Sequence, residues 1–182
     1  MAERTTYILV DGENIDATLG VSVLGRRPQP EERPRWGKLL THAEDVWGSR
    51  VSGLFFLAMG DSLPVGFVQA LTAMGYRPVP LRGDGKVVDI AIQRTAEALQ
   101  DRPADVMLVS HDADFVPQMT ALAETEGRRT ALVGFHEFFA GELRGIPGIE
   151  LIDLEYDVEA FTSRLPRIRI IDIDEFDPLE FI

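Results

Sequence analysis

The chain has 182 residues, of which 45% are hydrophobic and 26% are charged, and its formal net charge is −12. A chain of this length and composition normally folds into one domain with a buried core, rather than remaining disordered. It contains no cysteine, which excludes disulfides, thiolate metal sites and cysteine nucleophiles. His42, His111 and His136 are far apart in the sequence, so a histidine-rich metal site is not expected.

The N-terminal segment and the apolar runs bear on where the protein acts. A charged residue already stands at Glu3, and no hydrophobic signal-peptide region follows it. No apolar run is long enough to span a bilayer. We therefore expect a cytoplasmic protein that has no membrane partner.

The acidic residues are unevenly distributed along the chain. Residues 150–182 contain ten acidic residues and three arginines, net −7, whereas the first 149 residues contain 20 acidic and 15 basic residues, net −5. The total alone argues against nucleic-acid binding, because phosphate contacts need Lys and Arg. Since much of the excess lies at the C-terminus, we treat residues 1–152 as the domain and residues 153–182 as an acidic extension.

Short apolar runs alternate with amphipathic segments through the body. In chain order, the pattern predicts a strand at 7–10, a loop at 20–34, a helix at 35–47, a strand at 51–59, a helix at 62–74, a strand at 76–81, a helix at 86–100, a strand at 106–109, a helix at 115–126, a strand at 129–134, a helix at 136–144 and a strand at 149–152. This alternation requires crossover connections, so we predict an α/β fold with a mostly parallel sheet and helices on both faces. In the extension, residues 168–174 alternate apolar and charged side chains as an edge strand does.

Acidic residues stand at the ends of predicted strands and at the start of a predicted helix. Asp11 follows the first strand, Asp89 lies in the first turn of a helix, and Asp112 and Asp114 follow the fourth strand. In a doubly wound sheet, ligands bind at the carboxyl ends of the strands where the strand order reverses. If the first and fourth strands are neighbours there, these carboxylates converge, and they cannot all stay ionised without a cation. Oxygen ligands select Mg²⁺ or Mn²⁺, which suits phosphodiester hydrolysis.

Each of these residues also has a purely structural explanation. Asp11 could be a turn residue, Asp114 is placed to cap a helix that has a proline in its first turn, and Asp89 could complement a helix dipole. Asp89, however, has apolar neighbours, and an unpaired carboxylate is costly there, which favours a functional role. We expect His111 to be a surface or supporting residue, since one histidine is weak support for general-base chemistry.

Three motifs, in this order and at this spacing, resemble the NYN domain family, a branch of the PIN-like ribonucleases that includes the LabA-like bacterial proteins. The motifs are Val10-Asp-Gly-Glu-Asn-Ile15, Lys86-Val-Val-Asp-Ile90 and Ser110-His-Asp-Ala-Asp-Phe115. The resemblance spans about residues 5–152. It implies a three-layer α/β/α PIN-like (Rossmann-like) sandwich and RNA cleavage that depends on Mg²⁺ or Mn²⁺.

The resemblance also implies roles for single residues. Asp11, Asp89, Asp112 and Asp114 match the family's acidic positions, which implies that they bind metal and carry catalysis. Asn14 matches a polar partner that would orient a ligand or phosphate, and Ser110 matches a serine that orients the loop; both are expected on the substrate-binding side of the site. The Arg/Pro-rich loop at 20–34 and the acidic extension both depart from the family pattern.

Basic residues near the acidic motifs are candidates for holding RNA. Residues 26–38 have a net charge of +3, with Arg26 and Arg27 soon after the first motif, and Lys86 begins the second. Such side chains contact phosphates without reading sequence, although a solvated surface explains the arginines equally well. Trp36 could stack on a base, but its helical spacing favours the core.

Several functions are consistent with this pattern. The first is a metal-dependent ribonuclease, and the alternative is a PIN-like module that binds RNA or protein with little or no turnover. Phosphotransfer is disfavoured, because a receiver needs a lysine where Gly134 stands and the phosphatase pattern needs an aspartate where Glu13 stands. Dinucleotide binding lacks its glycine-rich turn. We expect the extension to dock on the body, on a second copy in a homodimer, or on a protein partner.

Overall fold

The structure, a computed structural model, describes residues 3–168 and 170–182. Its centre is a six-stranded sheet in the order β3-β2-β1-β4-β5-β6, in which all neighbouring strands are parallel. The strands are β1 (Thr5–Asp11), β2 (Arg50–Ala58), β3 (Arg77–Leu81), β4 (Ala104–Val109), β5 (Thr130–Gly134) and β6 (Glu150–Asp153). β1 lies between β2 and β4, so the strand order reverses there and the condition set by the sequence, that the first and fourth strands are neighbours, is met.

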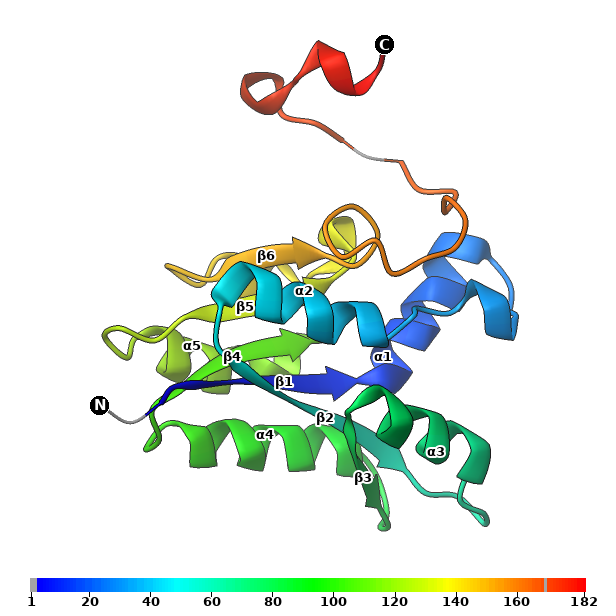
Figure 1. Cartoon of the computed structure of the whole chain (residues 1–182), viewed down its shortest axis with the longest axis vertical. Helices are drawn as coiled ribbons and strands as arrows, with labels where there is room; N and C mark the ends of the chain where they lie inside the picture. The colour runs from blue at the N-terminus through cyan, green and yellow to red at the C-terminus, as the bar shows by residue number, and fades with distance from the viewer. Residues whose placement is uncertain (1–2, 169) are drawn as a thin grey trace.

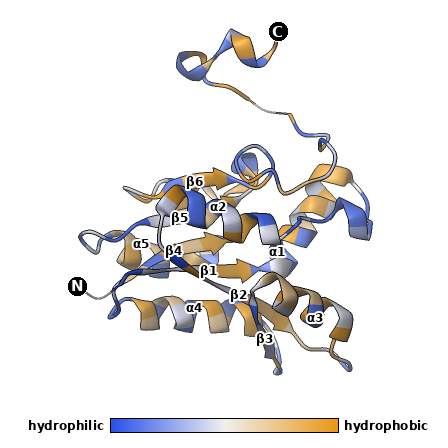
Figure 2. Cartoon of the chain, viewed as in Figure 1, coloured by the Kyte–Doolittle hydropathy of each residue, from blue (hydrophilic) through white to orange (hydrophobic). Residues whose placement is uncertain are grey.

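Helices cover both faces of the sheet, which confirms the α/β/α sandwich (Figure 1). They are α1 (Gly12–Ala17), α2 (Gly37–Trp47), α3 (Val65–Met74), α4 (Val87–Leu99), α5 (Val116–Ala123) and α6 (Gly141–Arg144). Because strand side chains alternate between faces, Ile8 and Val10 pack into the core under α2 and α3, whereas Leu9 packs into the core under α4 and α5. Burial on both faces explains why the middle of β1 and most of β4 and β5 are apolar (Figure 2).

The segment after β1 is helical where the sequence predicts a turn and a loop. α1 continues directly into a π-helix, Thr18–Leu24, which ends at Gly25 in the left-handed conformation with φ 69°. A 3₁₀ turn follows at Pro30–Glu32. The loop prediction for 20–34 is therefore wrong over its first residues. Ile15 and Leu19, four residues apart, are fully buried and hold the helix against the core, and the nearby glycines mask this signal in the sequence.

Two further predicted elements differ from the structure. The helix expected at 136–144 is a 3₁₀ turn, His136–Phe138, followed by the four-residue α6. The edge strand expected at 168–174 is not formed by its described residues, which include the start of a 3₁₀ turn at Ile173–Glu175, while Arg169 lies outside the described residues. Alternating side chains make a strand only where a sheet edge is available to pair with it.

The first part of the predicted extension packs against the body. Four of its apolar side chains are buried in the same core as β1 and α2: Leu154, Val158, Ala160 and Leu165. The described residues beyond Arg167 extend away from the sheet (Figure 1). They expose seven large apolar side chains, Ile168, Ile170, Ile173, Phe176, Leu179, Phe181 and Ile182. A dimer or protein partner for this segment stays a prediction. Within the described chain, no helix is both long and apolar enough to cross a membrane.

Arg167 fixes the point at which the chain leaves the body. Its side chain is 1% exposed, and its guanidinium donates to the carboxylates of Glu137 at 2.6 Å, Asp153 at 2.7 Å and Glu155 at 3.1 Å. The same group lies 4.9 Å from the ring centre of Phe135, so it is both paired and stacked. Burial raises the pKa of Asp153, but the bonds from Arg167 and from backbone amides bring the pKa below its usual value.

Replacing Arg167 with Met should destabilise the fold strongly. The substitution leaves buried carboxylates without their cation, and removing one partner of a buried ion pair costs about 3–5 kcal/mol. We expect the free energy of unfolding from urea denaturation at pH 7 to fall by about 3 kcal/mol. Because the pKa of Asp153 is lowered in the folded chain, the loss should shrink as the pH falls through that pKa. The matched control is Arg164→Met, since Arg164 is exposed; equal losses in both variants would contradict the role of Arg167.

Candidate metal centre

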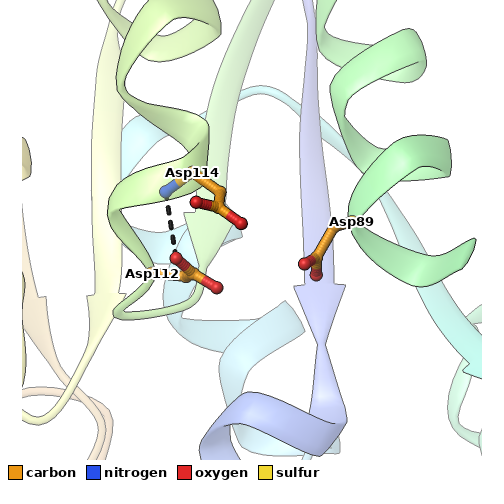
Figure 3. A group of neighbouring side chains, drawn as sticks. All are labelled: Asp89, Asp112 and Asp114. Carbon is orange, nitrogen blue, oxygen red and sulfur yellow. Dashed lines mark hydrogen bonds between the residues drawn. The ribbon is translucent and has the colours of Figure 1, made fainter. Parts of the chain in front are cut away.

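The carboxyl ends of β1 and β4 lie side by side where the strand order reverses, and aspartates surround them. Asp89 reaches this point from the first turn of α4, and Asp112 and Asp114 from the 3₁₀ turn after β4. One carboxylate oxygen from each of the three lies within 4.8 Å of the others. Figure 3 shows the three side chains pointing toward one another. The cluster, named here the aspartate cluster, could hold a divalent cation.

Hydrogen bonds orient the loop that carries two of these aspartates. Asp112 Oδ1 accepts the N–H of Asp114 at 2.9 Å and caps the 3₁₀ turn. Asp114 does not cap α5 as expected, because the N-cap of α5 is Phe115 and no side chain caps it. The Asp112 N–H in turn donates to Ser110 Oγ at 3.2 Å. Ser110 Oγ donates to Asp11 Oδ2 at 3.1 Å. One serine therefore connects the end of β1 to the loop, as expected of a residue that orients it.

Asp11 is the most buried of the predicted acidic residues. It is 3% exposed, and its carboxylate also accepts the N–H of Asn14 at 3.4 Å. Burial raises the pKa of Asp11 to about 6, against the hydrogen bonds from Asn14 and Ser110, and repulsion from Asp89 and Glu13 adds to the rise. Asp11 lies outside the group of three but close enough to Asp89 to be repelled by it. Its role as a metal ligand stays a prediction.

The ammonium group of Lys86 lies against the aspartate cluster. Its Nζ is 2.8 Å from Asp114 Oδ2 and 3.7 Å from Asp89 Oδ2. The hydrogen bond to Asp114 raises the pKa of Lys86. Burial, followed by repulsion from Asp112, raises the pKa of Asp89, and Lys86 opposes that rise. Oxygens of the cluster thus already bind one cationic group, which is the fit expected of a site that accepts a metal ion.

Buried His111, a residue of the third motif, holds the site together through its hydrogen bonds. His111 is 6% exposed, and its Nε2 accepts the N–H of Phe135 at 2.8 Å. Its Nδ1 lies 2.9 Å from Asn14 Oδ1, and because an amide oxygen only accepts, Nδ1 carries the proton. The same oxygen accepts the backbone N–H of His111 at 2.9 Å. Of the two positions expected for His111, the structure excludes the surface and agrees with a supporting residue, because the fold brings Phe135 against this ring.

The predicted RNA-binding arginines make contacts of their own. Arg26 forms two bonds of 2.7 Å with the carboxylate of Glu32, and Arg27 is exposed. Among the described residues, no hydrogen bond or ion pair joins either arginine to the aspartate cluster. Their contact with RNA stays a prediction, as does that of Asn14, whose side-chain oxygen is already used by His111.

Asp11 and His111 predict opposite pH dependences of stability. The folded pKa of Asp11, about 6, exceeds its usual 3.8, so stability falls as the pH rises from about 4 to 6. Burial lowers the pKa of His111 from 6.5 to about 4, so its contribution rises as the pH increases over nearly the same range. Each contribution is about 3 kcal/mol, so the two largely cancel in the native chain.

The variant Asp11→Asn removes the first contribution and leaves the second. Relative to the native chain, its free energy of unfolding should rise by about 3 kcal/mol between pH 4 and pH 6.5. Urea denaturation in the presence of EDTA measures this difference without interference from bound metal. A difference that stays constant over the range would show that Asp11 is not a protonated, buried carboxyl group.

Removing the ammonium of Lys86 should tighten metal binding. Lys86→Gln abolishes the positive charge 2.8 Å from Asp114 and frees its oxygen, so we expect Mn²⁺ to bind several-fold more tightly in isothermal titration calorimetry. Arg82→Gln removes a charge from an exposed position in the same loop and serves as the control. Unchanged or weaker Mn²⁺ binding in Lys86→Gln, with the control unchanged, would mean that the metal binds elsewhere.

Comparison with known proteins agrees with this geometry. A crystal structure of a protein of unknown function from Vibrio parahaemolyticus superimposes with a TM-score of 0.68 at 17% identity, covering 85% of this chain and 95% of that one. At this identity, the likeness establishes the fold alone. No curated protein matches the sequence. The profile of the NYN domain matches residues 5–153, which is most of the chain. The protein therefore belongs to the NYN domain family, within the PIN-like nuclease superfamily.

Proposed function

We propose that the protein is a ribonuclease that hydrolyses RNA phosphodiester bonds at the aspartate cluster with the help of Mg²⁺ or Mn²⁺. The observation that carries the proposal is the approach of three carboxylates to within 4.8 Å at the point where the strand order reverses. Such an arrangement is costly unless a cation offsets it. It occurs here in a member of a nuclease superfamily.

The charges of the cluster suit a divalent cation. Three carboxylates and the ammonium of Lys86 sum to −2, and Asp11 adds a fourth carboxyl group nearby. Asp89, Asp112 and Asp114 would hold the ion, and the more deeply buried Asp11 would add negative charge near it. When bound, a divalent cation supplies the charge that polarises a phosphoryl oxygen and activates the attacking water.

The remaining residues hold these ligands and the substrate in place. Ser110 fixes the direction of Asp11 and of the Asp112 loop through its two hydrogen bonds. Asn14, locked by neutral His111, keeps the start of α1 against the end of β4. Lys86 lies at the exposed side of the cluster, where its ammonium would contact a phosphate next to the scissile bond.

A second candidate is a PIN-like module that binds RNA or protein without turnover. The ion pairs of Lys86 favour it, because they neutralise part of the cluster without any metal. Against it, a module without catalysis gains nothing from keeping carboxylates that repel one another. The two candidates differ in one measurable property, which is RNA cleavage.

The test is cleavage of labelled single-stranded RNA by the purified protein with Mn²⁺. We expect cleavage that EDTA abolishes and that Asp89→Asn lowers by about 100-fold or more, since even residues that only orient metal ligands contribute about 10–100-fold. Asp101→Asn is the matched control. Asp101 is exposed and lies just before the amino end of β4, whereas the aspartate cluster lies at the carboxyl end of that strand. Equal cleavage by Asp89→Asn and the native chain would point to a contaminant or another site. No cleavage by either, with RNA still bound, would favour the binding module.

A further inference from the structure

A largely apolar groove opens beside the first acidic motif and has no assigned role. Its volume is about 550 Å³, within the range of about 300–1,000 Å³ that is usual for small-molecule sites. Four parts of the chain form it: the start of α1, the proline-rich segment before α2, the end of β2, and α3. Among the residues that line it are Glu13, Arg35, Trp36, Phe55 and Phe67.

The groove is continuous with the carboxyl end of β1. Its floor includes the ring of Phe55, and a Cβ on Gly12 would lie 2.6 Å from that ring. Gly12 directly follows Asp11, so the absence of a side chain there lets the aromatic ring approach the first acidic motif. A molecule in the groove would therefore lie next to the strand end that faces the aspartate cluster.

The walls of the groove form an aromatic surface that is open on one side. Phe55 packs edge-on against Trp36 at 5.3 Å and against Phe67 at 5.4 Å between ring centres. Trp36 and Phe55 are buried, but Phe67 is 39% exposed. The partly exposed ring of Phe67 thus packs on buried Phe55, which itself packs on buried Trp36, and it offers a platform on which a flat molecule can stack.

Two unpaired charges stand at the rim. Arg35 and Glu13 are exposed, and no hydrogen bond or ion pair of their side chains is formed within the described parts of the chain. Arg33, by contrast, is paired with Asp16 at 2.7 Å. A free guanidinium suits a phosphate, and a free carboxylate accepts hydrogen bonds from the amino group of a base.

We propose that this groove binds one nucleobase of the RNA whose neighbouring phosphate lies at the aspartate cluster, an inference that rests on the proposed function. The base stacks on Phe67, Glu13 accepts from its exocyclic amino group, and Arg35 contacts the backbone. The acidic segment 170–182 is the rival occupant, but it contains five acidic and no basic residues. Unpaired Glu13 lines the groove and would repel the segment's carboxylates, whereas a nucleobase carries no charge.

The experiment measures binding in EDTA, so that it does not depend on cleavage. Fluorescence anisotropy compares a labelled octamer of adenosine with an octamer of the same backbone that lacks bases. We expect the first to bind more tightly, and Phe67→Ala to weaken its binding by about 5- to 150-fold, the range of base–aromatic stacking. Phe67→Tyr should keep the affinity. Phe181→Ala is the matched control, because Phe181 is a 59% exposed ring in the C-terminal segment.

A second signal comes from Trp36 itself. The chain has two tryptophans, so in a Trp47→Phe background the emission reports on the groove alone, and the adenosine octamer should quench it while the octamer without bases should not. Equal binding of both octamers, or native affinity in Phe67→Ala, would overturn the proposal. So would a change in Trp36 emission on deleting residues 170–182 without RNA, which would identify that segment as the occupant. Base-dependent binding without cleavage would instead refute only the proposed function.

Discussion

Repulsion between carboxylates at one end of the sheet is the constraint around which this protein is arranged. The parallel sheet brings the ends of β1 and β4 together, and with them the aspartates that follow each strand. The structure limits the cost in two ways: Lys86 contributes an ammonium at 2.8 Å from Asp114, and burial favours the protonated form of Asp11, whose pKa rises to about 6. An arrangement that needs such compensation could hold a cation at this end of the sheet.

The carboxylates stay close because the backbone beneath them cannot relax. Neutral His111 is bonded on one side to Asn14, which follows β1, and on the other to the N–H of Phe135, which follows β5. Gly134 leaves room for this ring, since a Cβ there would lie 2.5 Å from His111 Nε2. Three strand ends are thereby joined through one uncharged side chain. The His111 ring must stay neutral, because a buried imidazolium would be costly to desolvate and would have no nitrogen left to accept the N–H of Phe135.

Much of the fold and part of the site can be predicted from the sequence, for identifiable reasons. Apolar runs predict the strands. Because parallel strands end on one side of a sheet, four aspartates are expected to meet there, and three of them, Asp89, Asp112 and Asp114, form the cluster while Asp11 lies outside it. Contacts between residues far apart in the sequence could not be predicted from it. Nothing near His111 indicates that Phe135 will donate to it, and nothing in 150–182 indicates that Arg167 will lie among carboxylates. The π-helix after α1 depends on burial of Leu19 in a core that local pattern does not reveal.

Arg167 also divides the C-terminal region into two parts with different physical properties. Before Arg167, the C-terminal region buries apolar side chains in the core. After Arg167, the chain adds five acidic residues and one arginine, net −4, and none of its described side chains is buried. A chain that ended at Arg167 would keep every buried contact and carry −8 instead of −12. The last fifteen residues therefore change the long-range field that an approaching polyanion meets without changing the packed fold, so electrostatic tuning and folding are separable along the sequence.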